Sequence, residues 1–94
     1  MDSDRIFLAV LSKPETRSQG RLVALDGRVA EVALEGSFRI ERGELVEFST
    51  QATLYLGEVE SSEVRDSSQL LRVNVEHSLD LAKAAWIQKL WNMN

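Results

Sequence analysis

The chain has 94 residues, no cysteine, 44% hydrophobic residues and a net charge of −4 at pH 7. This length allows at most one domain with one hydrophobic core, and the absence of thiols excludes disulfides and cysteine-ligated zinc. The negative net charge argues against nucleic acid and anionic membranes as partners, because unspecific binding to either needs a positive surface.

The absence of cysteine and the amino-terminal segment favour a cytoplasmic protein. A small domain without disulfides is typical of a reducing compartment. The apolar stretch at residues 6–11 is short for a signal peptide, and Asp2 and Asp4 precede it where a signal peptide carries positive charge. No run in the sequence approaches the roughly 18 apolar residues of a membrane span. We therefore expect a soluble, cytoplasmic protein without a membrane partner.

Short segments with strand character alternate with polar breaks in the first half of the chain. Residues 5–11 (RIFLAVL) are short and apolar, which favours a strand over a helix. Residues 12–20 contain proline, glycine and small polar residues and are predicted to form a loop. Residues 35–37 (EGS) break the pattern, and residues 38–40 (FRI) are predicted to resume a strand.

A hairpin is the strongest local signal in this half. Asp26 and Gly27 stand between two β-prone runs, a pattern that predicts a type I′ turn because that turn needs positive φ at both central positions. Pairing across this turn would place Leu25 opposite Arg28. Apolar residues fall on both faces of the hairpin, as expected when a sheet curls and buries parts of each side.

The second half continues with strands and polar connections. Residues 41–44 (ERGE) predict a turn around Gly43, and strands are predicted at residues 45–50 and 52–60. Residues 61–68 (SSEVRDSS) have the composition of a solvated loop.

Residues 69–77 give the cleanest alternation in the sequence. Leu71, Val73 and Val75 point to one face of the predicted strand, and polar residues occupy the other face. This pattern predicts a strand with one buried face and one solvent-exposed face.

A terminal helix is predicted over residues 78–92. Ser78 is the expected N-cap, because its hydroxyl can accept a hydrogen bond from a free backbone N–H, and Asp80 in the first turn suits the positive end of the helix dipole. An apolar stripe recurs at spacings of three and four residues, which predicts that the helix covers the open end or a face of the sheet. The stripe consists of Leu79, Ala82, Trp86, Leu90 and Met93.

The same helix has a second apolar face. Leu81 and Ala84 extend a face that contains Ile87 and Trp91, and one helix cannot easily bury two faces on one small sheet. Either the barrel wraps the helix on two sides, or part of the helix meets a partner. Exposed tryptophan is enriched at binding hot spots. We therefore expect a candidate interface at Ile87, Leu90 and Trp91, used for self-association or for another protein.

These elements predict a mainly β protein. Six or seven short strands with tight turns, over residues 5–76, favour a small antiparallel barrel followed by the helix, in one domain over residues 1–94. No helix is predicted between strands, which argues against a parallel βαβ arrangement. SH3-like and OB-type barrels are alternative folds of this class.

The strand order and several short motifs resemble a PilZ domain over residues 17–92. Residues 43–46 (GELV) and 57–59 (GEV) match an apolar stretch after glycine and a following G-E-V strand, and the closing strand and helix complete the likeness. The resemblance implies a six-stranded barrel that acts as a receptor or adaptor for cyclic di-GMP in bacterial signalling.

The ligand motifs of that family are only partly present. The R-x-x-x-R motif is matched by Arg17 and Arg21, and guanidinium groups suit phosphates and guanine faces. The D/N-x-S-x-x-G motif is incomplete, because Asp26 fits its first place while Arg28 and Glu31 stand where serine and glycine are expected. The resemblance therefore implies a degenerate nucleotide site.

Two functions follow from this reasoning. The first is a non-enzymatic signalling or adaptor module that acts through protein–protein interaction. The alternative is a cyclic di-GMP receptor that grips the dinucleotide with Arg17 and Arg21. No catalytic residue and no cofactor are expected, because His77 is the only histidine and lacks an oriented partner or a second metal ligand.

Overall fold

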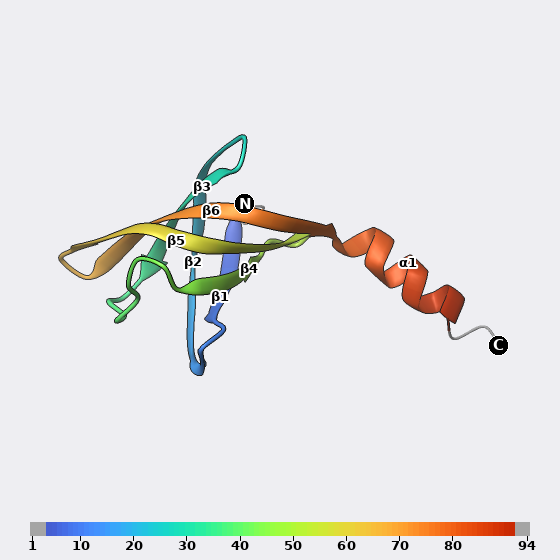
Figure 1. The fold of residues 1–94 in the computed structure, drawn as a ribbon, viewed down its shortest axis with the longest axis horizontal. Helices are drawn as coiled ribbons and strands as arrows, with labels where there is room; N and C mark the ends of the chain where they lie inside the picture. The colour runs from blue at the N-terminus through green and yellow to red at the C-terminus, as the bar shows by residue number, and fades with distance from the viewer. Residues whose placement is uncertain (1–3, 92–94) are drawn as a thin grey trace.

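The computed structural model describes residues 4–91, with the side chains of Ala84 and Trp91 outside the description. This part of the chain forms six strands and one helix (Figure 1). They are β1 (Arg5–Val10), β2 (Lys13–Asp26), β3 (Val29–Glu35), β4 (Leu45–Ser49), β5 (Thr53–Arg65), β6 (Ser68–Asp80) and α1 (Leu81–Trp91). All strand pairs are antiparallel, and the order β1-β2-β3-β6-β5-β4 closes where β4 pairs with β1. The prediction of a mainly β protein with an antiparallel barrel and a C-terminal helix is confirmed, with six strands.

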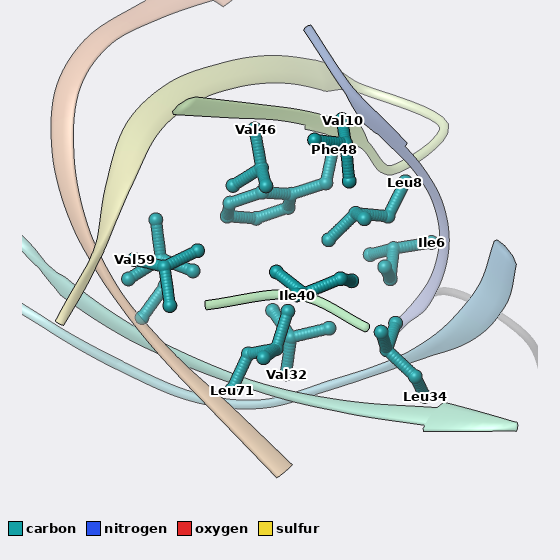
Figure 2. Close-up of a cluster of buried hydrophobic side chains, with 12 residues drawn as sticks. Ile6, Leu8, Val10, Val32, Leu34, Ile40, Val46, Phe48, Val59 and Leu71 are labelled. Carbon is teal, nitrogen blue, oxygen red and sulfur yellow. The ribbon is translucent and has the colours of Figure 1, made fainter. Parts of the chain in front are cut away.

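The core follows from the two-residue period of the strands. Every second side chain of β1 and β3 is buried, and the same alternation in β6 buries Leu71 and Val73, as predicted. Figure 2 shows these apolar side chains converging on the barrel axis. The buried set is Ile6, Leu8, Val10, Ala30, Val32, Leu34, Ile40, Val46, Phe48, Val59, Leu71 and Val73.

Two segments predicted to be loops are strands. Residues 12–20 lie almost entirely in β2, and most of residues 61–68 extends β5 and β6, which leaves a tight turn at Asp66 and Ser67. In both segments the polar side chains are mostly exposed, while the backbone pairs with a neighbouring strand. The predictions of loops were wrong because exposed strands can be as rich in polar residues as loops are. The polar composition of these segments indicated exposure to solvent and not the absence of a strand.

The predicted β2–β3 hairpin is confirmed, but its turn type and register were wrong. Asp26 pairs with Val29 and Leu25 with Ala30, so Gly27 and Arg28 are the central residues of the turn. Gly27 has φ +61°, whereas Arg28 is not among the positive-φ residues. Positive φ at the first central position alone is the pattern of a type II′ turn. The glycine takes the position that needs positive φ, and Asp26 stays in the strand.

Residues 38–40 do not form the predicted strand. Ile40 nevertheless lies in the core with only 4% of its surface exposed (Figure 2). The backbone N–H of Phe38 donates to Oε1 of the buried Gln69 over 2.7 Å. The segment is thus held by the Phe38–Gln69 hydrogen bond, by a hydrogen bond from Lys13 Nζ to the carbonyl oxygen of Arg39 over 3.4 Å, and by the apolar side chains of Phe38 and Ile40, rather than by a sheet ladder. The predicted turn around Gly43 is confirmed, with φ +93° at that glycine.

The helix begins three residues later than predicted. Ser78 lies in β6 opposite Tyr55, so it is not the N-cap. Asp80 has that role, because its Oδ1 accepts hydrogen bonds from the N–H groups of Ala82 and Lys83 over 2.9 and 3.2 Å. Strand pairing extends to Asp80, so the helix can begin only at Leu81, and Asp80 is both the last residue of β6 and the N-cap of α1.

Candidate interaction surface

The helix leaves the barrel without an intervening loop. Asp80 is still paired with Thr53 of β5, and the N–H of the next residue, Leu81, donates to the carbonyl oxygen of Ala52 over 2.9 Å. The β5–β6 ribbon thus passes directly into α1, and Figure 1 shows the helix continuing outward from the end of this ribbon. The prediction that the apolar stripe covers the barrel was therefore wrong, because the junction directs α1 away from it.

Because α1 points away from the barrel, its apolar side chains are exposed. Trp86, Ile87 and Leu90 are 64%, 49% and 47% exposed, and we call these three residues the helix face. Ile87 and Leu90 belong to the predicted interface; the side chain of the third predicted residue, Trp91, lies outside the described part, and so does Met93 of the stripe. The charged residues of α1 are Lys83 and Lys89, so the helix is cationic as well as apolar.

The nearby end of the barrel is open. Leu25, Tyr55 and Val75 line a hollow of about 540 Å³ between the β2–β3 hairpin and the β5–β6 ribbon, and we call these three residues the barrel mouth. Tyr55 stacks on Phe48 of the core with 5.0 Å between ring centroids, and Leu25 is 46% exposed. The other residues that line the hollow are Gly27, Arg28, Thr53, Glu76, His77, Ser78 and Asp80. The mouth therefore presents three apolar side chains within a mostly polar lining that includes two carboxylates.

Sequence reasoning missed the barrel mouth. It expected the helix to cover an opening of this kind, so no separate surface was predicted. The apolar residues on both faces of the hairpin were the available signal, since an inward-facing Leu25 at the end of a barrel strand has no covering layer of its own.

Arg17 and Arg21 lie on the outward face of β2 rather than on a loop. Both side chains are exposed, and a spacing of four residues along a strand separates their Cα atoms by about 13 Å. Arg21 donates from Nη2 and Nε to Oδ2 of Asp4 over 3.0 and 3.2 Å. Arg17 donates from Nε to the carbonyl oxygen of Pro14 over 3.2 Å. Their guanidinium groups are thus engaged with different parts of the chain.

A second hollow borders Arg17 but not Arg21. It has a volume of about 630 Å³, and its lining includes Arg17, Gln19, the exposed Phe7 and the carboxylates of Glu35 and Glu47. Gln19 accepts a hydrogen bond from Arg5. A planar anion would meet an aromatic face and a guanidinium group here, but also a negative charge.

Residues 4–91 show no metal site, no helix cap at His77 and no membrane-spanning helix. No group of three or more histidine, aspartate and glutamate side chains is arranged to hold a metal ion in this part of the chain. His77 is exposed on β6, opposite Leu56, and does not cap the helix. The one helix described, with 11 residues, is too short and not apolar enough to cross a membrane.

One carboxylate has a shifted pKa. Glu44 Oε2 accepts a hydrogen bond from the N–H of Glu41 over 2.6 Å, and Oε1 lies 3.2 Å from Lys13 Nζ. The bond from Glu41 lowers the pKa of Glu44 most, desolvation raises it in part, and Lys13 lowers it further. The net pKa is below the usual value of 4.5. Glu44 directly precedes β4, and its bond to the N–H of Glu41 spans the turn at residues 42–43. The carboxylate of Glu44 therefore stabilises this turn.

Comparison with protein-family models, with curated proteins and with solved structures returns no match to this chain.

Proposed function

We propose that the protein is a non-enzymatic, PilZ-like signalling or adaptor module of the cytoplasm that acts through protein–protein interaction. The observation that carries this proposal is the exposure of Trp86, Ile87 and Leu90 on a helix that projects from the barrel. Burial of apolar surface against a partner contributes roughly 25 cal/mol per Å² of favourable free energy. A contiguous apolar face on a rigidly held helix is therefore a favourable site for another polypeptide.

Site-specific photo-crosslinking tests this proposal. A photoreactive phenylalanine analogue is placed at Ile87, and in a matched control at Val64, which is 54% exposed near the far turn of the β5–β6 ribbon. We expect covalent protein adducts from position 87 in cells that produce the protein, and none from position 64. Adducts to any polypeptide, including a second copy, support the proposal. Equal yields at the two positions, or no adduct at position 87, overturn it.

A degenerate nucleotide site is part of the same proposal. Arg21 is paired with Asp4, and in the β2–β3 register it stands opposite Ala33, two residues from Glu31 on the same face of β3. A carboxylate at that diagonal position repels a phosphate. In this proposal Arg17 and Arg21 do not bind cyclic di-GMP with useful affinity.

The alternative function is a cyclic di-GMP receptor. The observation in its favour is the hollow that combines Arg17 with the exposed Phe7, since an aromatic ring and a guanidinium group suit a guanine and a phosphate. Calorimetric titration of cyclic di-GMP into wild type and Arg21→Ala distinguishes the two functions. We expect no binding heat from either protein. Heat from wild type that Arg21→Ala abolishes would favour the receptor.

A further inference from the structure

Two uncovered apolar surfaces lie at the same end of the molecule, namely the helix face and the barrel mouth. Trp86 and Ile87, with Ala82 and the stem of Lys83, border an apolar hollow of about 490 Å³ on α1. The mouth presents Leu25, Tyr55 and Val75. The apolar side chains of a projecting helix can pack on these three apolar side chains, while the polar lining of the mouth can meet the lysines of the helix.

The helix cannot reach the mouth of its own barrel. Asp80 pairs with Thr53 and also caps α1, and the N–H of Leu81 is bound to Ala52. Folding α1 back would break the strand pair, the cap and the junction hydrogen bond together, and no loop lies between Asp80 and Leu81 to make the turn. The helix face is therefore available to the mouth of another molecule and not to its own.

Charge favours a second copy as that molecule. Residues 81–91 carry Lys83 and Lys89 and no carboxylate, whereas the rest of the chain has nine cationic and fifteen anionic side chains, a net charge of −6 with histidine neutral. The hollow of the mouth contains Glu76 and Asp80 beside Arg28. The cationic helix of one copy and the acidic barrel of another attract each other at long range.

Two copies could pair their helices with each other, or each copy could insert its helix into the barrel mouth of the other. An 11-residue helix is about 16 Å long and about 11 Å wide, so half of its lateral surface is about 280 Å². Two such helices packed together bury about 600 Å² in total, which is the size of a crystal-packing contact. Entry of each helix into the mouth of the other copy covers both the helix face and the barrel mouth of each molecule, whereas pairing of the two helices leaves both mouths exposed.

We propose that two copies exchange their helices, so that Trp86 and Ile87 of each copy enter the barrel mouth of the other. The inference rests on the function proposed above and names a second copy as the partner. The arrangement is isologous, because each molecule contributes one helix and one mouth. Lys83 of one copy then lies within the field of the partner's acidic mouth.

Analytical ultracentrifugation of the full chain tests the stoichiometry. Wild type is expected to be a dimer, and Trp86→Glu and Leu25→Glu are each expected to raise the dimer dissociation constant at least about tenfold. Val64→Glu, the matched control at an exposed valine away from both surfaces, is expected to stay dimeric. Circular dichroism checks that each variant keeps its fold.

Disulfide trapping tests the geometry without relying on a destabilising variant. The chain has no cysteine, so single replacements report one contact each. A mixture of Leu25→Cys and Ile87→Cys is expected to form a mixed disulfide under mild oxidation, and neither variant alone is expected to form one efficiently. Efficient bonding of Ile87→Cys with itself, or an unaffected Leu25→Glu dimer, would establish helix pairing and overturn the exchange.

The failure of this inference is distinguishable from failure of the proposed function. A chain that stays monomeric at millimolar concentration, yet gives adducts with another protein from position 87, overturns helix exchange and leaves the interaction module standing. A monomeric chain without any such adduct overturns both.

Discussion

The backbone N–H of Phe38 donates a 2.7 Å hydrogen bond to Oε1 of Gln69, thirty-one positions later in the chain. Gln69 is 1% exposed, and its Nε2 donates to Oγ of Ser62 over 2.7 Å. One amide thus joins the irregular segment 36–40 to β6 and β5. Ile40 of this segment lies in the core although no strand ladder pairs it.

Replacement of Gln69 is predicted to release this segment. Gln69→Leu removes the acceptor of the Phe38 N–H, and an unpaired buried donor costs about 1–3 kcal/mol of unfolding free energy. Urea denaturation measures this loss, and hydrogen exchange at the Phe38 amide is expected to accelerate. Ser61→Ala is the control, because Ser61 is an exposed residue of β5 and both hydrogen bonds of Gln69 stay intact, with an expected change within about 0.5 kcal/mol. Equal stability of Gln69→Leu and wild type would show that the segment does not depend on this bond.

Gly20 is predicted to be required for the close approach of β2 and β3. A Cβ added at this position would overlap the backbone carbonyl of Ala33 on β3, which cannot move without breaking the β2–β3 ladder. Gly20→Ala is therefore expected to lower the unfolding free energy by at least about 2 kcal/mol.

A second glycine serves as the matched control. Gly27→Ala meets no atom within 4 Å and suffers only from its φ of +61°, so it should cost about 1 kcal/mol. Thermal or urea unfolding compares the two variants. A smaller loss for Gly20→Ala than for Gly27→Ala would contradict the close approach of β2 and β3.

Asp80, and not Ser78, is predicted to be the residue that caps α1. Asp80→Ala removes the acceptor for the N–H groups of Ala82 and Lys83 and should weaken the first turn of α1 by about 1 kcal/mol. Carbon chemical shifts of residues 81–91 in NMR spectra measure the loss of helix. Asp80→Asn, which keeps an acceptor, should restore most of it. Ser78→Ala should leave α1 unchanged, and the opposite ranking of these two alanine variants would place the cap at Ser78.

The turn before β4 should become less stable in acid. Since the pKa of Glu44 is lowered in the folded state, its ionised carboxylate stabilises the fold above the usual value of 4.5, and this contribution is lost as the pH falls through the lowered pKa. Glu44→Gln should therefore cost about 1 kcal/mol at neutral pH and much less at about pH 3. Urea denaturation at both pH values gives the comparison. A cost that is constant or grows in acid would be inconsistent with this assignment.

The sequence by itself determined the strand class and much of the core. The alternation at Leu71, Val73 and Val75 identified the buried face of β6, because a strand sends successive side chains to opposite sides. The Asp26–Gly27 pair located a hairpin, since glycine supplies the positive φ that a tight turn requires. These signals are local, and each needs only neighbouring residues to be read.

Only the tertiary structure decided which polar segments are strands and where the helix goes. Residues 13–20 and 61–65 lie in strands because β1 and β6 pair with these segments, a relationship between distant segments that composition does not encode. The exposure of Trp86 depends on the junction between β6 and α1, where pairing of Asp80 with Thr53 directs α1 outward. An apolar stripe reports that a surface tends to be buried, while the geometry of the chain decides which molecule can bury it.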